Sequence, residues 1–360
     1  MADGIGQMFC VSLAGPELNG DERRMLSAVR PGCVLLFARN CQTAPQVRAL
    51  TDELRGIAGH DVLIAIDQEG GRVDRLRAFL PPMPSAAETA RGGLAAATQL
   101  GDIIGRALRL LGVNFNFAPV LDYAPPACAE ARNGLETRLW AKEPREIAGL
   151  TRGFLAAMQQ ADVIGCLKHF PGLGRAAQDP HQSLPVTQVI MREWEKTDFH
   201  IYHELMRSGL PGAVMVSHAA YPDLEPAGVA PRPASMSPYV VEQLLREKLG
   251  FDGLAVTDDL SMGAAVEFAG STSNAASQAI AAGLDLLLVC GQPDLVTETH
   301  AALAREKTID AARLAASHGR ISRVRQLTPP PPPFDNHALA RQAERIIALR
   351  LALRRELHTN

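Results

Sequence analysis

The sequence lacks several features that mark membrane, dinucleotide-binding and metalloprotease families. No apolar run reaches the roughly 18 residues that a membrane-spanning helix requires. The first 15 residues, MADGIGQMFCVSLAG, have neither a basic region nor a long apolar region, so they predict a first strand rather than a signal peptide. GxGxxG, P-loop, HExxH and GxSxG motifs are all missing, which argues against dinucleotide, nucleotide-phosphate, zinc-protease and serine-hydrolase chemistry.

The sequence also has no CxxC pair of cysteines and only a small net charge. The six cysteines form no CxxC motif, and Cys10, Cys33, Cys166 and Cys290 lie in apolar segments, where a free thiol behaves as a small hydrophobe. Lys and Arg number 36 against 39 Asp and Glu, which gives a formal net charge of -3. We therefore expect a reduced, cytoplasmic protein without a nucleic-acid or membrane partner, present as a monomer or a weak homodimer.

Eight short apolar runs alternate with stretches of helical spacing. This alternation predicts an α/β fold, and eight repeats favour a closed (β/α)8 TIM-type barrel over an open, doubly wound sheet. Several of the runs are apolar almost throughout, as expected of parallel strands buried on both faces. The predicted strands are residues 8–13, 33–37, 62–66, 114–117, 165–167, 213–216, 254–257 and 285–289.

Helices are predicted between these strands and at the end of the chain. The clearest are residues 43–58, 95–111, 144–160, 238–249 and 273–282. Residues 329–333 are five consecutive prolines, a stiff extended spacer that leads to a last helix over residues 337–357. We therefore expect one catalytic barrel over residues 1–328, with residues 329–360 as a proline-rich spacer and a helix packed on the barrel or trailing it.

Polar residues follow five of the predicted strands. Active sites of (β/α)8 barrels lie at the carboxyl ends of the strands, so these side chains are expected at one rim. They are Asp67, Asp122, the pair Lys168 and His169, His218, and the pair Asp258 and Asp259.

This set of groups suits sugar chemistry. Retaining glycoside hydrolysis needs a carboxylate that attacks the anomeric carbon and a donor that protonates the leaving oxygen. Asp258 directly follows an apolar strand, which fixes its backbone, and we assign it as the nucleophile. Aspartate also favours the first position of a helix, so Asp258 and Asp259 could instead form a helix cap. An Asp-Asp pair is compatible with a metal site too, but no further ligand spacing accompanies it.

Two longer motifs make the family recognisable. GFDGLAVTDDLSMGAA resembles the nucleophile segment of glycoside hydrolase family 3, and KHFPGLGRAAQDPHQSLP resembles a loop found in its single-domain bacterial β-N-acetylhexosaminidases. IAIDQEGGRVDRL, GCVLLFARN, FAPVLDY and MVSHAAYP match as well. The resemblance extends from Gly6 to Val324, nearly the whole predicted barrel.

The resemblance implies roles for individual residues. Asp258 would be the nucleophile, and His181 would be the general acid/base, oriented by Asp179. A histidine suits that task because its pKa lies near neutrality. Five positions that bind the N-acetylglucosamine ring match Asp67, Arg75, Arg138, Lys168 and His169.

His218 is added to the substrate-binding set on its position after a strand. The alternative is that His218 and Asp122 hold the rim residues in place rather than contact substrate.

The chain departs from the family pattern at a few positions. Leu173 stands where a histidine is usual, Arg175 where an aspartate is usual, and Pro180 where a serine is common. Arg138 is followed by Leu-Trp-Ala instead of Ser-Phe-Gly. These changes put loop behaviour and substrate preference in question, because Arg175 adds a cation where an anion is usual.

The resemblance implies a retaining exo-β-N-acetylglucosaminidase that acts on muropeptides or related glycosides through a covalent glycosyl-Asp intermediate, with no cofactor and no metal ion. The alternatives are an N-acetylglucosaminide phosphorylase, in which Arg175 could assist phosphate, or another β-glycosidase on the same scaffold. A Schiff-base lyase using Lys168 and a sugar-binding protein without catalysis are further alternatives.

Overall fold

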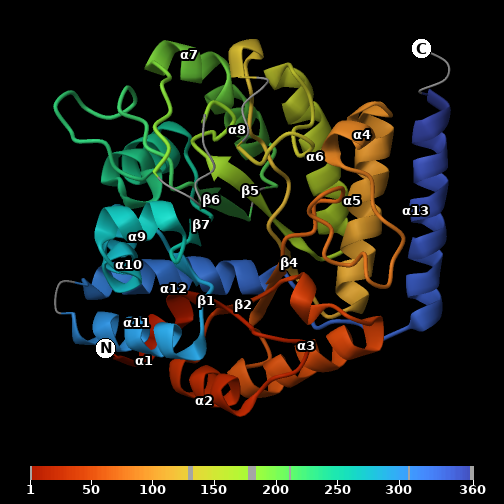
Figure 1. Ribbon diagram of the computed structural model, residues 1–360, viewed down its shortest axis with the longest axis horizontal. Helices are drawn as coiled ribbons and strands as arrows, with labels where there is room; N and C mark the ends of the chain where they lie inside the picture. The colour runs from red at the N-terminus through yellow and green to blue at the C-terminus, as the bar shows by residue number, and fades with distance from the viewer. Residues whose placement is uncertain (1, 129–132, 177–183, 211, 307–308, 357–360) are drawn as a thin grey trace.

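The eight predicted strands form a closed parallel barrel in the computed structural model of the chain, which describes residues 2–128, 133–176, 184–210, 212–306 and 309–356. Each strand pairs with the next in sequence, and β8 pairs with β1 (Figure 1). The predicted TIM-type fold is therefore confirmed. The strands are β1 Phe9–Ser12, β2 Cys33–Leu36, β3 Leu63–Ile66, β4 Phe115–Asn116, β5 Ile164–Phe170, β6 Ala213–Val216, β7 Leu254–Asp259 and β8 Leu286–Val289.

Helices surround the barrel. The predicted helix that begins after Thr43 is capped by the Thr43 side chain, which accepts a hydrogen bond from the Gln46 backbone N–H. The helices are α1 Ala2–Ile5, α2 Gly20–Val29, α3 Ala44–Ala58, α4 Ala86–Ala90, α5 Gly93–Leu110, α6 Pro144–Gln160, α7 Met191–Lys196, α8 Asp198–Met206, the π-helix η5 Tyr239–Lys248, α9 Gly263–Ala269, α10 Thr272–Ala282, α11 Pro293–Arg305, α12 Ala311–Gln326 and α13 Asn336–Glu356. Short 3-10 turns are η1 Gly6–Met8, η2 Ala38–Asn40, η3 Pro126–Cys128 and η4 Ala234–Met236.

Side chains of the strands point alternately into the barrel and out toward the helices. In β3, Leu63 and Ala65 belong to the apolar cluster inside the barrel, whereas Ile64 and Ile66 belong to the cluster beneath the helices. Both faces are buried, which explains why the strands read as continuous apolar runs. Ile321 and Val324 of α12 also belong to the inner cluster, so this helix closes the barrel end opposite the rim.

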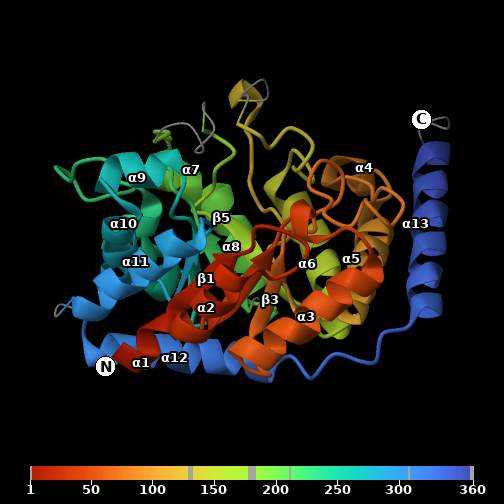
Figure 2. The same ribbon diagram turned by 60° about the horizontal axis from the view of Figure 1, so that its bottom comes forward.

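The chain after α12 runs back along the outside of the barrel. Arg109 donates hydrogen bonds to the carbonyl oxygens of Pro329 and Pro330, at 2.8 and 2.9 Å. Figures 1 and 2 show α13 standing beside α5 at the edge of the molecule. Its buried residues are Leu339, Ile346, Leu349 and Leu353, together with the polar Gln342.

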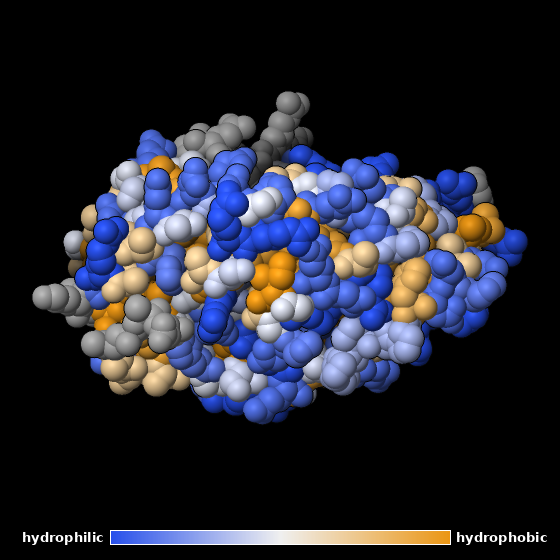
Figure 3. Space-filling view, turned by 90° about the horizontal axis from the view of Figure 1, so that it is seen from below, coloured by the Kyte–Doolittle hydropathy of each residue, from blue (hydrophilic) through white to orange (hydrophobic). Residues whose placement is uncertain are grey.

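The surface over α2 and α3 is mainly hydrophilic, with apolar side chains in scattered small patches (Figure 3). None of the helices that the structure describes combines the length and the hydropathy needed to cross a membrane.

Candidate active site

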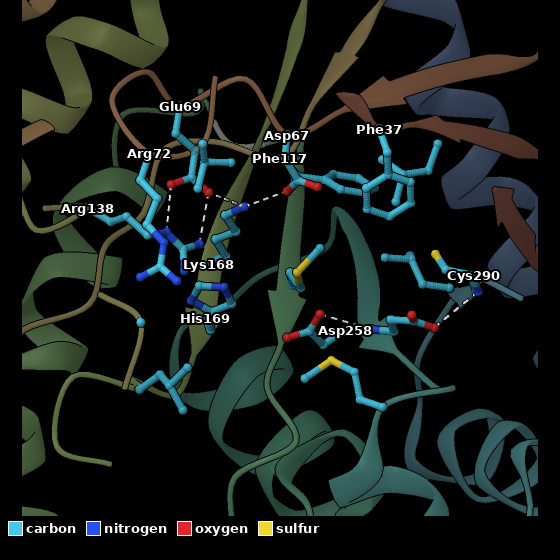
Figure 4. Close-up of a pocket in the computed structure, with 18 of the residues that line it drawn as sticks. Phe37, Asp67, Glu69, Arg72, Phe117, Arg138, Lys168, His169, Asp258 and Cys290 are labelled. Atoms are coloured by element: carbon cyan, nitrogen blue, oxygen red, sulfur yellow. Dashed lines mark hydrogen bonds and ion pairs between the residues drawn. The ribbon is translucent and has the colours of Figure 1, made fainter. Parts of the chain in front are cut away.

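A cavity of about 260 Å³ opens at the carboxyl ends of the strands. Charged side chains line one side of it, and Asp258 lies across the cavity from them (Figure 4). This is the rim at which the sequence predicted the site. The polar lining residues are Asp67, Glu69, Arg72, Arg75, Asn133, Arg138, Lys168, His169, Asp258 and Asp259, with Phe37, Phe117, Leu173, Met215, Met262 and Cys290 among the apolar or weakly polar ones.

Lys168 is the centre of the charged side. It extends from β5, and its Nζ lies 2.7 Å from Asp67 Oδ1 at the end of β3. The same ammonium lies 2.7 Å from Glu69 Oε1. Burial opposes the charge on Lys168, but the two carboxylates outweigh that effect and raise the pKa of the lysine. Lys168 is therefore a fixed cation that can donate hydrogen bonds to sugar hydroxyls.

Glu69 connects Lys168 to Arg138. Arg138 Nε and Nη2 lie 2.8 and 2.9 Å from the two oxygens of Glu69, a bidentate pair that fixes the plane of the guanidinium. Burial alone would raise the pKa of Glu69, but Arg138 and Lys168 hold it far below its usual range. Glu69 is a residue of the site that was not predicted from the sequence. Its signal was the position two residues after Asp67, just beyond the same strand.

Arg75 is held beside Asp67 on the same side of the cavity. Its Nη2 lies 3.8 Å from Asp67 Oδ2, and its guanidinium lies over the ring of Phe37 at 5.6 Å. The Arg75 backbone N–H donates to Gln68 Oε1, which fixes the turn after β3. Gly70 in that turn has φ +90, and a Cβ there would lie 2.2 Å from the Pro84 carbonyl oxygen. Glycine is therefore required for the turn that presents Arg75.

His169 lines the cavity and is oriented by Asp122. Its Nδ1 lies 2.7 Å from Asp122 Oδ2, and its backbone N–H donates to Asp122 Oδ1 at 3.2 Å. The same Oδ1 accepts a hydrogen bond of 2.7 Å from the Leu173 backbone N–H. Asp122 is buried, and it orients His169 and Leu173 at the rim. This position favours the alternative that Asp122 holds rim residues in place rather than contacts substrate.

His218 lies fully buried, and it is not among the residues that line the cavity. Its Nδ1 lies 2.7 Å from Ser235 Oγ, and its Nε2 lies 3.0 Å from the Asp259 carbonyl oxygen. Burial lowers the pKa of His218, although the charge of Asp258 acts in the opposite direction. This placement favours the alternative that His218 holds the end of β7 rather than contacts substrate.

The two aspartates at the end of β7 have different surroundings. Asp259 accepts hydrogen bonds from the backbone N–H groups of Ser261 and Cys290 and from Ser261 Oγ, at 3.0, 3.1 and 2.8 Å. Its carboxylate therefore holds the turn after the strand. The Asp258 carboxylate lines the cavity and accepts a hydrogen bond of 2.9 Å from the Asp259 backbone N–H. No group of three possible metal ligands occurs among the residues described.

The structure describes some of the other residues singled out from the sequence and leaves the rest undescribed. Asp179 and His181 lie outside the residues that the structure describes, as does Pro180. Leu173 lines the cavity where the family usually has a histidine. Arg175 contacts acidic residues of α7 and α8 instead of lining the cavity. Cys290 also lines the cavity, and burial raises the pKa of its thiol, which keeps it protonated.

The chain is similar to known proteins in both sequence and structure. Residues 1–324 match the glycosyl hydrolase family 3 N terminal domain. The chain is 38% identical over 319 residues to a beta-hexosaminidase of Methylococcus capsulatus, covering 86% of this chain and 90% of that protein. A family 3 β-N-acetylglucosaminidase from a Paenibacillus species is similar in structure, with a TM-score of 0.86, 31% identity, and coverage of 97% of this chain and 68% of that one. NagZ from Neisseria gonorrhoeae, in complex with N-trifluoroacetyl-D-glucosamine, has a TM-score of 0.79, 28% identity, and coverage of 95% and 97%.

Proposed function

This chain belongs to glycosyl hydrolase family 3, and we propose that it is a retaining exo-β-N-acetylglucosaminidase. The observation that carries the proposal is the position of Asp258 across a small cavity from the Lys168 cluster, which consists of Asp67, Glu69, Arg138 and Lys168 (Figure 4). A sugar whose hydroxyl groups bind the cluster has room to place its anomeric carbon at Asp258.

The size of the cavity supports exo action. At about 260 Å³ it is slightly smaller than the usual range for small-molecule pockets. A cavity of this size takes one sugar unit and leaves the rest of the glycoside outside. The charged groups of the Lys168 cluster pair with one another and face the cavity. A ligand without hydroxyls would displace water from them and offer no hydrogen bond in return, which would weaken its binding. The cluster therefore selects for a hydroxylated ring.

In the proposed mechanism, Asp258 attacks C1 of the bound N-acetylglucosamine unit. The bond to the leaving oxygen breaks while His181 gives that oxygen a proton, and a covalent glycosyl-Asp258 ester forms. His181 then takes a proton from water, whose oxygen attacks C1 and releases the sugar with retained configuration. Asp179 orients His181 and favours its protonated form.

Two of the described cavity carboxylates, Asp67 and Glu69, are poor candidates for the proton donor. Asp67 is an ion-pair partner of Lys168. Glu69 is an ion-pair partner of both Lys168 and Arg138, and its lowered pKa keeps it ionised at neutral pH. Neither is suited to donate a proton there. This supports the assignment of the acid/base role to His181, in the part of the chain that the structure does not describe.

Lys168 is unsuited to Schiff-base chemistry. Formation of a Schiff base requires a neutral amine, which enzymes obtain by lowering the pKa of the lysine. Here the pKa is raised, and two carboxylates hold the ammonium. The lyase alternative is therefore not supported by the site.

Phosphorolysis receives no support from Arg175. From the sequence alone, the added cation of Arg175 could have assisted phosphate. The guanidinium instead lies 3.2 Å from Glu193 and 3.8 Å from Asp198, with 5% of the side chain exposed. We therefore propose water, rather than phosphate, as the acceptor.

The experiment for the proposed function is hydrolysis of p-nitrophenyl N-acetyl-β-D-glucosaminide with and without inorganic phosphate, with the first-formed anomer identified by NMR. The proposal expects β-N-acetylglucosamine and no dependence on phosphate. Strict dependence on phosphate, an inverted product or no turnover would each contradict it.

The natural substrate, compartment and oligomeric state are further proposals. We propose that the natural substrate is a muropeptide that carries a terminal N-acetylglucosamine unit. The rate on such a glycoside relative to the nitrophenyl compound tests this.

The described cysteines are all free thiols, and four of them are buried, which supports a reducing, cytoplasmic setting. We also propose a monomer or a weak homodimer, which light scattering measures.

A further inference from the structure

Arg175 is a buried arginine that joins three elements of the structure. Its Nη2 donates a hydrogen bond of 3.0 Å to Thr197 Oγ1, between α7 and α8. The guanidinium also pairs with Glu193 of α7 and Asp198 of α8. Its other neighbour is Tyr123, after β4, whose ring lies 5.3 Å from the guanidinium carbon. A charged side chain with this many partners and 5% exposure is unlike a solvated surface arginine.

Asp198 is the buried partner of this arginine. Its Oδ1 has no hydrogen-bond partner, and burial raises the pKa of Asp198 to about 7 although Arg175 acts in the opposite direction. A Cβ added to Gly172 would lie 2.2 Å from the same Oδ1, so the chain passes very close to Asp198 at that point. Two residues of one short segment, Gly172 and Arg175, therefore meet at a single buried carboxyl group.

The backbone of that segment is fixed at successive residues. Trp194 Nε1 donates to the Pro171 carbonyl oxygen at 2.8 Å, and the Tyr221 hydroxyl donates to the Gly172 carbonyl oxygen at 3.0 Å. The Leu173 backbone N–H donates to Asp122 at 2.7 Å. The Arg175 side chain adds its contacts with α7, α8 and Tyr123. Asn133 Nδ2 donates to the Ala176 carbonyl oxygen at 3.0 Å, which is the last of these attachments before residue 177, where the described residues end.

The same attachments connect Arg175 to the sugar-binding side. Asp122, which orients His169, directly precedes Tyr123, which lies against the Arg175 guanidinium. A series of contacts therefore runs from His169 in the cavity, through Asp122 and Tyr123, to Arg175. His181 follows Arg175 by six residues in the sequence.

We propose that Arg175 is a positioning residue for proton transfer: by holding the segment of residues 171–176 on α7, α8 and Tyr123, it sets where the chain leaves toward His181. The proposal rests on the proposed function, in which His181 protonates the leaving group. Arg175 is not among the described residues that line the cavity, so this role is separate from sugar binding.

The role predicts a dependence on the leaving group. A poor leaving group, such as the alkoxide of a methyl glycoside, requires protonation as the bond breaks, whereas 2,4-dinitrophenolate departs with little help. Misplacing the acid therefore lowers kcat/KM for the methyl glycoside and largely spares the dinitrophenyl glycoside. A general loss of folded enzyme would lower both to the same extent.

The experiment compares R175M, R175K and wild-type full-length protein on the methyl and 2,4-dinitrophenyl N-acetyl-β-D-glucosaminides. Arg246→Met is the matched control, because Arg246 is also a buried arginine, paired at 2.6 Å with Asp285 at the opposite end of the barrel. For R175M we expect kcat/KM on the methyl glycoside to fall at least about tenfold further than on the dinitrophenyl glycoside. R175K should recover part of this difference, and R246M should show none.

The outcomes separate this proposal from the proposed function. If wild-type protein cleaves neither glycoside, the proposed function fails. If wild-type protein cleaves both and R175M loses equally on both, or loses nothing, the positioning role of Arg175 is overturned. Should R175M fail to fold, D198N tests the same attachment, because it removes the buried charge while keeping a side chain of similar shape. D198N is then expected to show the same selective loss, in a smaller degree, and an equal loss on both glycosides would overturn the proposal.

Discussion

Lys168 Nζ lies 2.7 Å from Glu69 Oε1, the same distance that it keeps from Asp67 Oδ1. Glu69 thus balances two buried cations, Lys168 and Arg138. Its loss would leave Lys168 paired with Asp67 and would take from Arg138 the carboxylate of its bidentate pair. The Lys168 cluster is therefore expected to stabilise the fold as well as to form the proposed sugar-binding surface.

Replacing Glu69 with Gln should destabilise the protein and weaken sugar binding. Removing one member of a buried ion pair costs about 3–5 kcal/mol, because the remaining charge is left without compensation. Urea unfolding and KM for the nitrophenyl glycoside measure the two effects. Glu195→Gln is the control, since Glu195 pairs with Lys248 at the exposed surface, outside the cavity lining, and should change stability by at most about 1 kcal/mol. Equal effects of the two substitutions would contradict this account of Glu69.

The final helix is expected to stabilise the barrel through its inner face only. Ile346 is fully buried, whereas its neighbour Ile347 is 50% exposed. Ile346→Ala should cost about 2–4 kcal/mol, since it leaves a cavity beneath α13, and Ile347→Ala should cost under about 0.5 kcal/mol. Chemical unfolding measures both, and unchanged kcat/KM on the nitrophenyl glycoside is expected for each. A small effect at Ile346 would mean that α13 trails the barrel rather than supports it.

The raised pKa of Asp198 predicts a pH-dependent difference in stability. Because its pKa is about 7 in the folded protein and lower in the unfolded chain, the folded state binds the proton more tightly between these values. The contribution of Asp198 to stability therefore decreases as the pH rises from about 4 to 7. D198N has no such titration, so its stability relative to wild type should improve by about 1 kcal/mol per pH unit in this window. Urea unfolding at pH 5 and pH 7 tests this, and a constant difference would contradict it.

The two aspartates after β7 should respond differently to substitution by Asn. D258N is expected to fold normally and to lose turnover by on the order of 10⁴-fold or more, as when other catalytic nucleophiles are removed. D259N should mainly lower stability, because Asp259 holds Ser261 and Cys290 in place. Steady-state kinetics with a thermal melt separates the two. A more active D258N than D259N would reverse the assignment.

Much of the fold was predictable because each strand is a separate apolar run. The positions of Asp67, Lys168, His169 and Asp258 on one rim followed from strand counting and the family resemblance. The (β/α)8 architecture converts strand ends into a common site, which makes this kind of prediction possible.

The missed features depend on side-chain direction, which sequence spacing leaves open. Nothing in the run Asp-Gln-Glu indicates that Glu69 turns back to Lys168 while Gln68 supports the turn. His218 follows a strand as Asp258 does, yet burial and two hydrogen bonds remove it from the cavity. Arg175 looked like an added charge near the substrate, but its partners Glu193 and Asp198 come from helices much later in the chain.

The most direct test of the central claim is mass spectrometry of the protein after reaction with a 5-fluoro derivative of an activated N-acetyl-β-D-glucosaminide. Such a compound slows the second step, so the glycosyl-enzyme ester accumulates. The account predicts one sugar attached through the Asp258 carboxylate in the peptide that contains β7, and no label in D258N. A label on Asp67, Glu69 or Asp259, or turnover without any covalent intermediate, would contradict it.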